Sequence, residues 1–241
     1  MMRAFWAGVA PGGGHWYRQS ADSLGRNAHP GVSGDRAWSD RSRSAMSDSF
    51  EMLVDVDVGA EEAEGVARTV LDRFHTLGLI SGEANRDCVL GGTGYRPGPA
   101  VADLYSREDR ESLFWELVTC GVEVQVGRGF NEWALGPVCE GFRCSACDAA
   151  IEPFGDEFGD ALGTAIGEWV NQSGPALVPC PRCCAQRSIT AWECRPPLGF
   201  GNLSVRFWNW PPLDSSSWKI DIPRTLEDVT CHMIVKTHGH L

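Results

Sequence analysis

Two short cysteine motifs constrain this chain more than any other feature of its sequence. They are Cys144-Ser-Ala-Cys147 and Cys180-Pro-Arg-Cys183. A Cys-x-x-Cys turn places two thiolates on one side of a tight turn, close enough to share a metal ion. Two such turns brought together supply the closed tetrahedral shell that Zn²⁺ takes at structural sites. We therefore predict that Cys144, Cys147, Cys180 and Cys183 are the ligands of a structural zinc ion.

The two motifs resemble those of zinc-ribbon proteins, and the resemblance is limited to residues 144–183. It implies that each motif forms one knuckle of a four-cysteine zinc site. The sequence departs from the simple pattern in one respect, because 32 residues lie between Cys147 and Cys180, whereas simple ribbons use roughly 15–20. An inserted element must therefore lie between the knuckles. Cys184 directly follows Cys183, so the register of the second knuckle is open between these two residues.

A disulfide framework and a redox-active dithiol are the alternative interpretations of a chain with ten cysteines. No secretory signal is visible, because the apolar stretch at residues 5–10 is short and is followed by Pro11 and three glycines. The sequence contains no run of about 18 apolar residues, so no membrane span is expected. Paired Cys-x-x-Cys motifs in a cytoplasmic chain favour metal over disulfides. We therefore expect a cytoplasmic zinc protein.

The other cysteines differ in what their surroundings predict. Cys88 and Cys120 lie among apolar residues and are expected to be small core residues. If one of the four predicted ligands is wrong, the possible substitutes are Cys139, Cys184, Cys194 and Cys231.

Charge is distributed unevenly along the chain. The net charge is −11, but residues 1–45 contain six Arg and three Asp, a net of +3, so the remainder carries −14. This acidity opposes nucleic-acid binding, which needs Lys and Arg to displace counterions from phosphates. An acidic surface suits a basic protein partner instead.

The first 45 residues are unlike the rest of the chain. They are rich in Gly, Ser and Arg and show no helical or strand periodicity, so we expect residues 1–45 to be a disordered leader. Two origins are open. The leader is either not translated, with Met46 as the true start, or it is a targeting arm or disordered tail.

Residues 46–138 are expected to form an α+β subdomain. Residues 50–58 alternate between apolar and polar side chains, which predicts a strand with one buried face and one solvated acidic face carrying Asp55 and Asp57. Residues 60–77 have the apolar periodicity of a helix. A second helix is expected over residues 106–120, and further strands at residues 87–90 and 122–126. A ferredoxin-like fold is one arrangement that fits these helices and strands.

Residues 139–241 are expected to form a subdomain built of a zinc ribbon, a helical insertion and an antiparallel β-sheet. Between the knuckles, apolar side chains recur at every fourth residue from Phe158 to Val170, which predicts a helix. Glycines recur beside them, so we expect this helix to need a closely packed neighbour. After Cys184, short alternating segments predict strands at residues 189–193, 203–210, 218–222 and 233–236.

No catalytic motif is found in the sequence. The His-x-Glu half of the zinc deaminase signature is missing, and His232, His238 and His240 are expected to lie in a solvated tail. Trp208 and Trp210 share one face of an alternating segment and are expected to cap a small core, the alternative being an exposed anchor for a partner. The sequence therefore favours a zinc-stabilised protein-binding or adaptor module, with a zinc-dependent hydrolase whose metal keeps an open position as the alternative.

Overall fold

The computed structural model describes residues 48–106, 114–136, 138–152 and 156–241. The leader predicted at residues 1–45 lies outside the described residues, and so does the stretch 107–113 of the second predicted helix. The described residues form one compact unit. It contains both helices and antiparallel strands, which confirms the α+β class.

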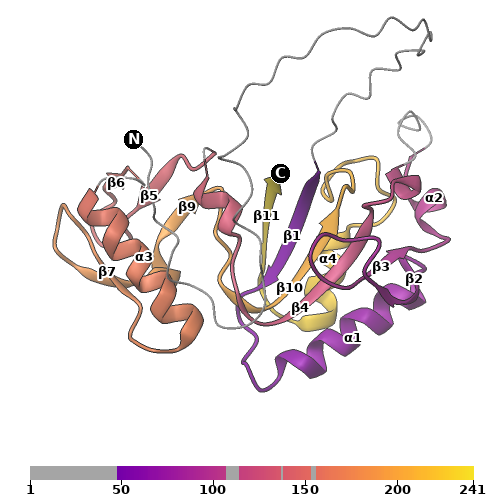
Figure 1. Cartoon of the computed structure of the whole chain (residues 1–241), viewed down its shortest axis with the longest axis horizontal. Coiled ribbons are helices and arrows are strands. Elements are labelled where there is room, and N and C mark those ends of the chain that lie inside the picture. The colour runs from indigo at the N-terminus through magenta and orange to yellow at the C-terminus, as the bar shows by residue number, and fades with distance from the viewer. Residues whose placement is uncertain (1–47, 107–113, 137, 153–155) are drawn as a thin grey trace, which may run out of the picture. The chain divides into compact units, whose positions relative to one another are not determined.

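A six-stranded antiparallel sheet is the largest element of the fold (Figure 1). Its order is β11-β1-β10-β4-β3-β2. The strands are β1 (Ser49–Asp55), β2 (Ile80–Asn85), β3 (Gly94–Pro97), β4 (Gly121–Gly129), β10 (Gly201–Trp208) and β11 (Ile234–His240). The predicted strands at 50–58, 122–126, 203–210 and 233–236 are thus present with shifted ends. The predicted strand at residues 87–90 is wrong, because these residues form bends between β2 and β3.

The first strand of the sheet lies between two strands from the end of the chain. In β1, Leu53 pairs with Val205 of β10 on one side and with Lys236 of β11 on the other. The sheet therefore contains strands that precede and strands that follow the subdomain boundary predicted between residues 138 and 139. This order does not confirm a ferredoxin-like layer within residues 46–138, since β10 separates β1 from β4.

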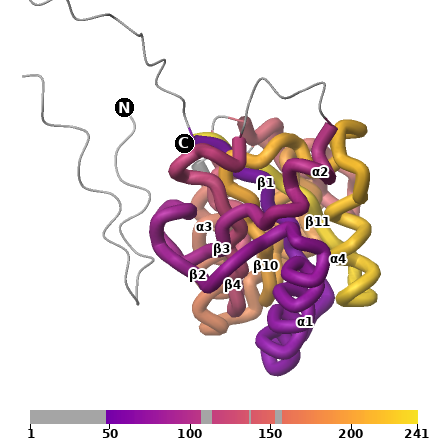
Figure 2. Tube along the Cα trace, turned by 90° about the vertical axis from the view of Figure 1, so that its right-hand side faces the viewer, coloured from indigo at the N-terminus to yellow at the C-terminus, as the bar shows by residue number. Residues whose placement is uncertain are grey.

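Two helices cover one face of the sheet. They are α1 (Ala63–Thr76) and α4 (Ile222–Thr230), which contact each other and lie side by side in Figure 2. Buried side chains from both helices and from four strands form one cluster here, including Leu53, Val70, Phe74, Ile80, Val122, Val205, Phe207, Ile222 and Leu226. The solvated acidic face predicted for residues 50–58 is therefore wrong at Asp55, whereas Asp57, just beyond the end of β1, is exposed as predicted. Asp55 is 1% exposed because β1 is a central strand covered on both faces.

Trp208 and Trp210 are both buried but belong to different clusters. Trp208 packs with Phe50 and Met52, whereas Trp210 belongs to the cluster under α1 and α4. Asn209 between them has a positive φ of 56°, which breaks the strand alternation. The prediction that the two tryptophans share a face is wrong for this reason. Their burial confirms a core role and leaves no exposed anchor.

The segment before the last strand also differs from its prediction. Residues 218–222 were expected to be a strand, but α4 begins at Ile222. Asp221 caps this helix, accepting a hydrogen bond from the Arg224 backbone N–H at 2.8 Å, and Pro223 lies in its first turn. Two short pieces, α2 (Val101–Leu104) and the 3₁₀ turn η2 (Phe114–Glu116), flank the undescribed part of the second predicted helix.

The region around the cysteine motifs contains two small sheets and one long helix. The elements are η3 (Glu132–Leu135), β5 (Gly141–Arg143), β6 (Ala150–Ile151), α3 (Asp156–Asn171), β7 (Leu177–Pro179), β8 (Gln186–Ser188), η4 (Ile189–Ala191) and β9 (Glu193–Arg195). One sheet has the order β6-β5-β9, and β7 pairs with β8. α3 is the predicted insertion between the knuckles.

The buried face of α3 follows the predicted four-residue repeat. Phe158, Leu162 and Ile166 are buried in a cluster that also contains the two knuckle cysteines Cys144 and Cys180. The expected close packing along the glycines is wrong at Gly167, because nothing lies within 4 Å of the position where its Cβ would be.

Candidate metal centre

Each knuckle is the turn of a β-hairpin. The first, residues 144–147, connects β5 to β6, in which Arg143 pairs with Ala150. The second, residues 180–183, connects β7 to β8, in which Pro179 pairs with Gln186. Short strands thus fix the entry and exit of each Cys-x-x-Cys turn.

The first knuckle is closed by two backbone hydrogen bonds. The Cys144 N–H donates to the Ala149 carbonyl at 3.0 Å, and the Asp148 N–H donates to the Cys144 carbonyl at 2.8 Å. Asp148 has a left-handed backbone with φ 60°. The Ala146 N–H also points at the Cys144 sulfur, 3.4 Å away.

The second knuckle repeats this geometry position by position. The Cys180 N–H donates to the Ala185 carbonyl at 2.9 Å, and the Cys184 N–H donates to the Cys180 carbonyl at 2.9 Å. Cys184 has φ 58°, and the Arg182 N–H lies 3.4 Å from the Cys180 sulfur. Cys184 is therefore the counterpart of the turn residue in the first knuckle and not of a ligand.

The two hairpins bring four sulfur atoms together. The Sγ atoms of Cys144, Cys147, Cys180 and Cys183 all lie within 4.8 Å of one another. The Cys144–Cys183 distance is 4.0 Å and the Cys147–Cys180 distance is 3.8 Å. Four thiolates bound to Zn²⁺ at about 2.3 Å would lie about 3.8 Å apart. The four cysteines can therefore hold a metal ion with little movement.

The pKa values of these thiols show what a cation would change. For Cys180, burial opposes ionisation, but hydrogen bonds from the backbone of Cys183 and Arg182 outweigh it and lower its pKa to about 7. For Cys147, a hydrogen bond from the Ala149 backbone lowers the pKa, but the neighbouring thiols raise it to about 12. Four thiols this close resist ionising together, and a bound cation removes that resistance.

The other described cysteines lie outside this four-sulfur cluster. Within the described ranges it is the only group of three or more His, Cys, Asp or Glu side chains placed to share an ion. Cys184 and Cys231 are exposed outside it, and Cys139 and Cys194 contact each other instead. Cys88 and Cys120 are fully buried, which confirms them as core residues, and burial raises the pKa of Cys120 to about 12.

Apolar packing holds the two hairpins in place. Phe142 of β5, Ile151 of β6 and Val178 of β7 are buried together with the α3 side chains. A carboxylate oxygen of Glu168, near the end of α3, accepts a hydrogen bond from the Ala176 N–H at 2.9 Å. This contact fixes the chain just before β7 and its knuckle.

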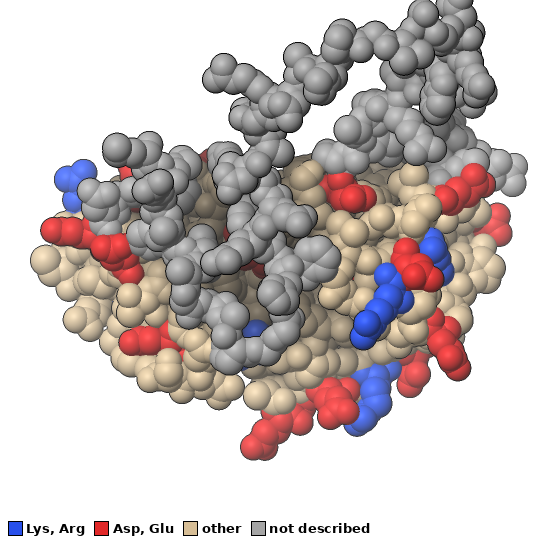
Figure 3. Space-filling model, in the orientation of Figure 1, with Lys and Arg blue, Asp and Glu red and all other residues tan. Residues whose placement is uncertain are grey.

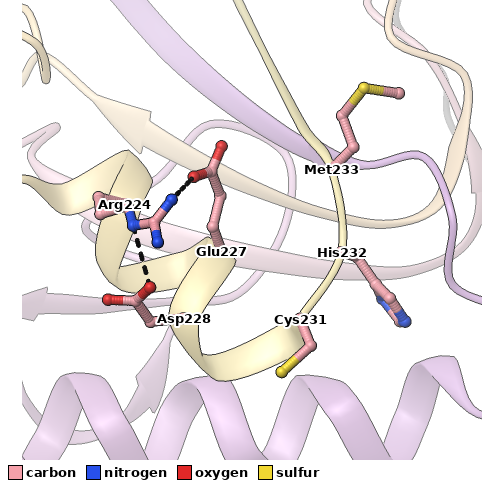
Figure 4. A pocket seen from close by; sticks show the side chains of 6 residues that line it. All are labelled: Arg224, Glu227, Asp228, Cys231, His232 and Met233. Atoms are coloured by element: carbon pink, nitrogen blue, oxygen red, sulfur yellow. Dashed lines mark hydrogen bonds and ion pairs between the residues drawn. The ribbon is translucent and has the colours of Figure 1, made fainter.

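A second polar site lies at the end of α4 and was missed by the sequence analysis. A shallow depression of about 470 Å³ is lined by Arg224, Glu227, Asp228, Cys231, His232 and Met233 (Figure 4). The His232 Nδ1 atom lies 2.9 Å from the Oδ2 atom of buried Asp55, so the expectation of a solvated histidine is wrong. No sequence signal joins the two residues, which are 177 positions apart.

This second site lacks the arrangement of a cysteine nucleophile and its base. In Figure 4 the Cys231 thiol and the His232 ring point in different directions. Arg224 pairs with Glu227 at 3.1 Å and with Asp228 at 3.0 Å, so its charge is already balanced. The hydrogen bond that the His232 ring donates to Asp55 raises the pKa of His232, against a smaller lowering by burial, and the charges of Asp55, Asp57 and Glu62 raise it further.

Acidic side chains are scattered over the described part of the face that Figure 3 shows. In the view of Figure 3, Asp and Glu lie at several separate places, with Lys or Arg beside some of them. No continuous basic patch is visible on the part of this face formed by described residues. None of the described helices is both long and apolar enough to span a membrane.

Comparisons with protein-family models, with curated proteins and with solved structures find no match to this chain. The resemblance to zinc ribbons therefore depends on the two knuckles and their geometry alone.

Proposed function

We propose that Cys144, Cys147, Cys180 and Cys183 hold one Zn²⁺ in a structural site, and that the chain is a protein-binding or adaptor module. The observation that carries the metal assignment is the approach of four sulfur atoms to within 4.8 Å from two hairpins of matching geometry. Among the common divalent ions that have no redox chemistry, thiolate ligands favour Zn²⁺.

The zinc ion would join the two hairpins across the inserted helix. Each hairpin strand has only two or three residues, too few to be stable alone. The binding free energy of a structural zinc ion becomes folding free energy for such elements. Metal binding is therefore expected to stabilise the whole cluster that packs under α3.

The alternative is a zinc-dependent hydrolase with an open metal position. Such a site needs a coordination position for water or substrate. Four thiolates fill the tetrahedral shell and leave none. The donor set thus favours the structural role.

The charge of the chain supports a basic protein as partner. Residues 46–241 carry a net charge of −14, which attracts a cationic surface and repels nucleic acid. The free thiolates that a zinc site needs are maintained in a reducing compartment, so we propose a cytoplasmic location.

The binding role is tested by capturing partner proteins on the zinc-loaded chain, which is immobilised through its C-terminus. The capture is carried out at about 0.05 M and at about 0.5 M salt. We expect a basic protein to bind at the lower salt and to be released at the higher, because screening shortens the range of the attraction. The captured protein is then purified, and its affinity is measured against ionic strength. An acidic partner, or an affinity independent of salt, would overturn the proposal, and so would zinc-dependent hydrolysis of ester or amide substrates without a partner.

A further inference from the structure

Two cysteines outside the metal cluster form a pair of their own. The Sγ atoms of Cys139 and Cys194 lie 3.8 Å apart, although the residues are 55 positions apart in the chain. Cys194 is in β9, opposite Phe142 of β5, and is buried. Cys139 lies just before β5 and is half-buried.

The backbone holds the two thiols at this distance. The Cys139 N–H donates to the Gly136 carbonyl at 3.0 Å, and the Glu140 N–H donates to the Arg195 carbonyl at 2.7 Å. The second bond fixes the chain next to Cys139 against the residue next to Cys194. A disulfide bond of about 2.0 Å therefore requires the sulfur atoms to approach by less than about 2 Å.

We propose that Cys139 and Cys194 are an oxidisable pair that closes to a disulfide on reaction with a peroxide, separately from the zinc thiolates. Shared metal binding does not explain their contact, because no third ligand joins them among the described residues.

The reaction balances with hydrogen peroxide as the oxidant. The half-buried Cys139 sulfur attacks one peroxide oxygen, the O–O bond breaks, and the thiol proton leaves with the other oxygen as water. Cys139 is then a sulfenic acid. The Cys194 sulfur attacks the Cys139 sulfur, the S–O bond breaks, and the Cys194 proton leaves with the hydroxide as a second water. Two thiols are oxidised and one peroxide is reduced.

The burial of Cys194 agrees with this order of events. Burial is the largest cause of the raised pKa of Cys194, and the neighbouring Cys139 raises this pKa further. Cys194 therefore stays protonated, and its sulfur is shielded from a dissolved oxidant. Cys139, which is more exposed, meets the peroxide first.

The bond would enclose the metal site. Residues 140–193, the loop between the two cysteines, contain both knuckles, both hairpins and α3. A cross-link at the base of this loop restricts the unfolded chain. Oxidation would therefore close the ribbon covalently, at a position that leaves the four metal thiolates unchanged.

Tryptic mapping tests the proposal without ambiguity. Cleavage after Lys and Arg, except at Arg195, which precedes Pro196, places Cys139 alone in the peptide 129–143 and Cys194 alone in the peptide 188–206. The knuckle cysteines fall in the peptides 144–182 and 183–187. The purified full chain is treated with hydrogen peroxide, free thiols are alkylated, and disulfide-linked peptides are identified by mass spectrometry. Zinc content is measured on the same samples.

We expect the linked peptide pair 129–143 with 188–206 to form before zinc is released, with the chain losing two hydrogen atoms. Cys184→Ser, which removes an exposed cysteine outside both groups, should leave this product unchanged, and Cys139→Ser should abolish it. The proposal is overturned if Cys139 in the wild-type chain becomes a sulfinic or sulfonic acid without the linked pair. It is also overturned if Cys139 links to the peptide 183–187 instead. Both outcomes are read on the wild-type chain, so they do not depend on the folding of a variant.

Discussion

At the scale of single residues, one backbone conformation selects between two adjacent cysteines. Cys184 adopts the left-handed conformation, φ 58°, which costs a non-glycine residue roughly 1–2 kcal/mol. The preceding sulfur, that of Cys183, lies 4.0 Å from the Cys144 sulfur. The turn geometry therefore makes Cys183 the fourth ligand of the proposed site.

This assignment predicts opposite results for two neighbouring substitutions. Cys183→Ser should lower zinc affinity by more than roughly 100-fold, beyond the range for losing an outer-shell partner, because it removes a ligand. Cys184→Ser should keep about one zinc per chain. Elemental analysis after dialysis and titration with a competing chelator measure both. Retention of zinc in Cys183→Ser together with its loss in Cys184→Ser would move the ligand to Cys184.

A second prediction at this scale concerns His232 and Asp55. Asp55 accepts the Asp57 and Val58 N–H groups through Oδ1 and faces His232 through Oδ2. The pKa of His232 is raised in the folded chain, mainly by this hydrogen bond. Its contribution to stability is thus fully present below the unfolded histidine pKa of about 6.5 and is lost as pH rises through the folded pKa.

His232→Asn should therefore lower the free energy of unfolding at pH 6 by about 1 kcal/mol, the size expected for a charge-assisted hydrogen bond that is partly exposed. At pH 9 the loss should be smaller. Urea unfolding of wild type and variant at both pH values measures the difference. A loss that grows with pH would contradict the account.

At the scale of elements, α3 and α4 show why one helix is predictable and another is not. α3 has sixteen residues, and its apolar side chains recur at every fourth residue from Phe158 to Val170, so its period is visible in the sequence. α4 has nine residues and only two buried apolar positions, Ile222 and Leu226, which is too short for a clear period. The informative signal was local: Asp221 as helix cap followed by a proline in the first turn.

The glycines of α3 give a prediction for this scale. Gly167 has nothing within 4 Å of its missing Cβ, so Gly167→Ala should raise the free energy of unfolding by up to about 1 kcal/mol through helix propensity alone. Gly201→Ala is the opposite case, because its Cβ would clash with the backbone oxygen of Asp55, and it should destabilise. Urea unfolding at one pH measures both. A destabilised Gly167→Ala would mean that this position of α3 packs against a neighbour after all.

At the scale of the whole molecule, the sequence predicts features that depend on local patterns, but it does not predict which distant strands pair. The spacing of the cysteines is local, so the four sulfurs that meet in the structure could be chosen from the sequence. The pairing of β1 with β10 and β11 joins residues more than 140 positions apart, such as Leu53 with Val205, and no feature of one sequence records it. The burial of Asp55 follows from that pairing. Because the pairing is not visible in the sequence, the sequence predicts an exposed Asp55.

The central claim is a closed four-thiolate zinc site, and X-ray absorption at the zinc edge tests it most directly. The full chain, purified without chelator, should contain about one zinc, with a first shell of four sulfur atoms at about 2.3 Å. The spectrum should not change when azide is added, because no coordination position is open. A chain without zinc, or a shell with fewer than four sulfurs and an oxygen or nitrogen that azide displaces, would contradict the account.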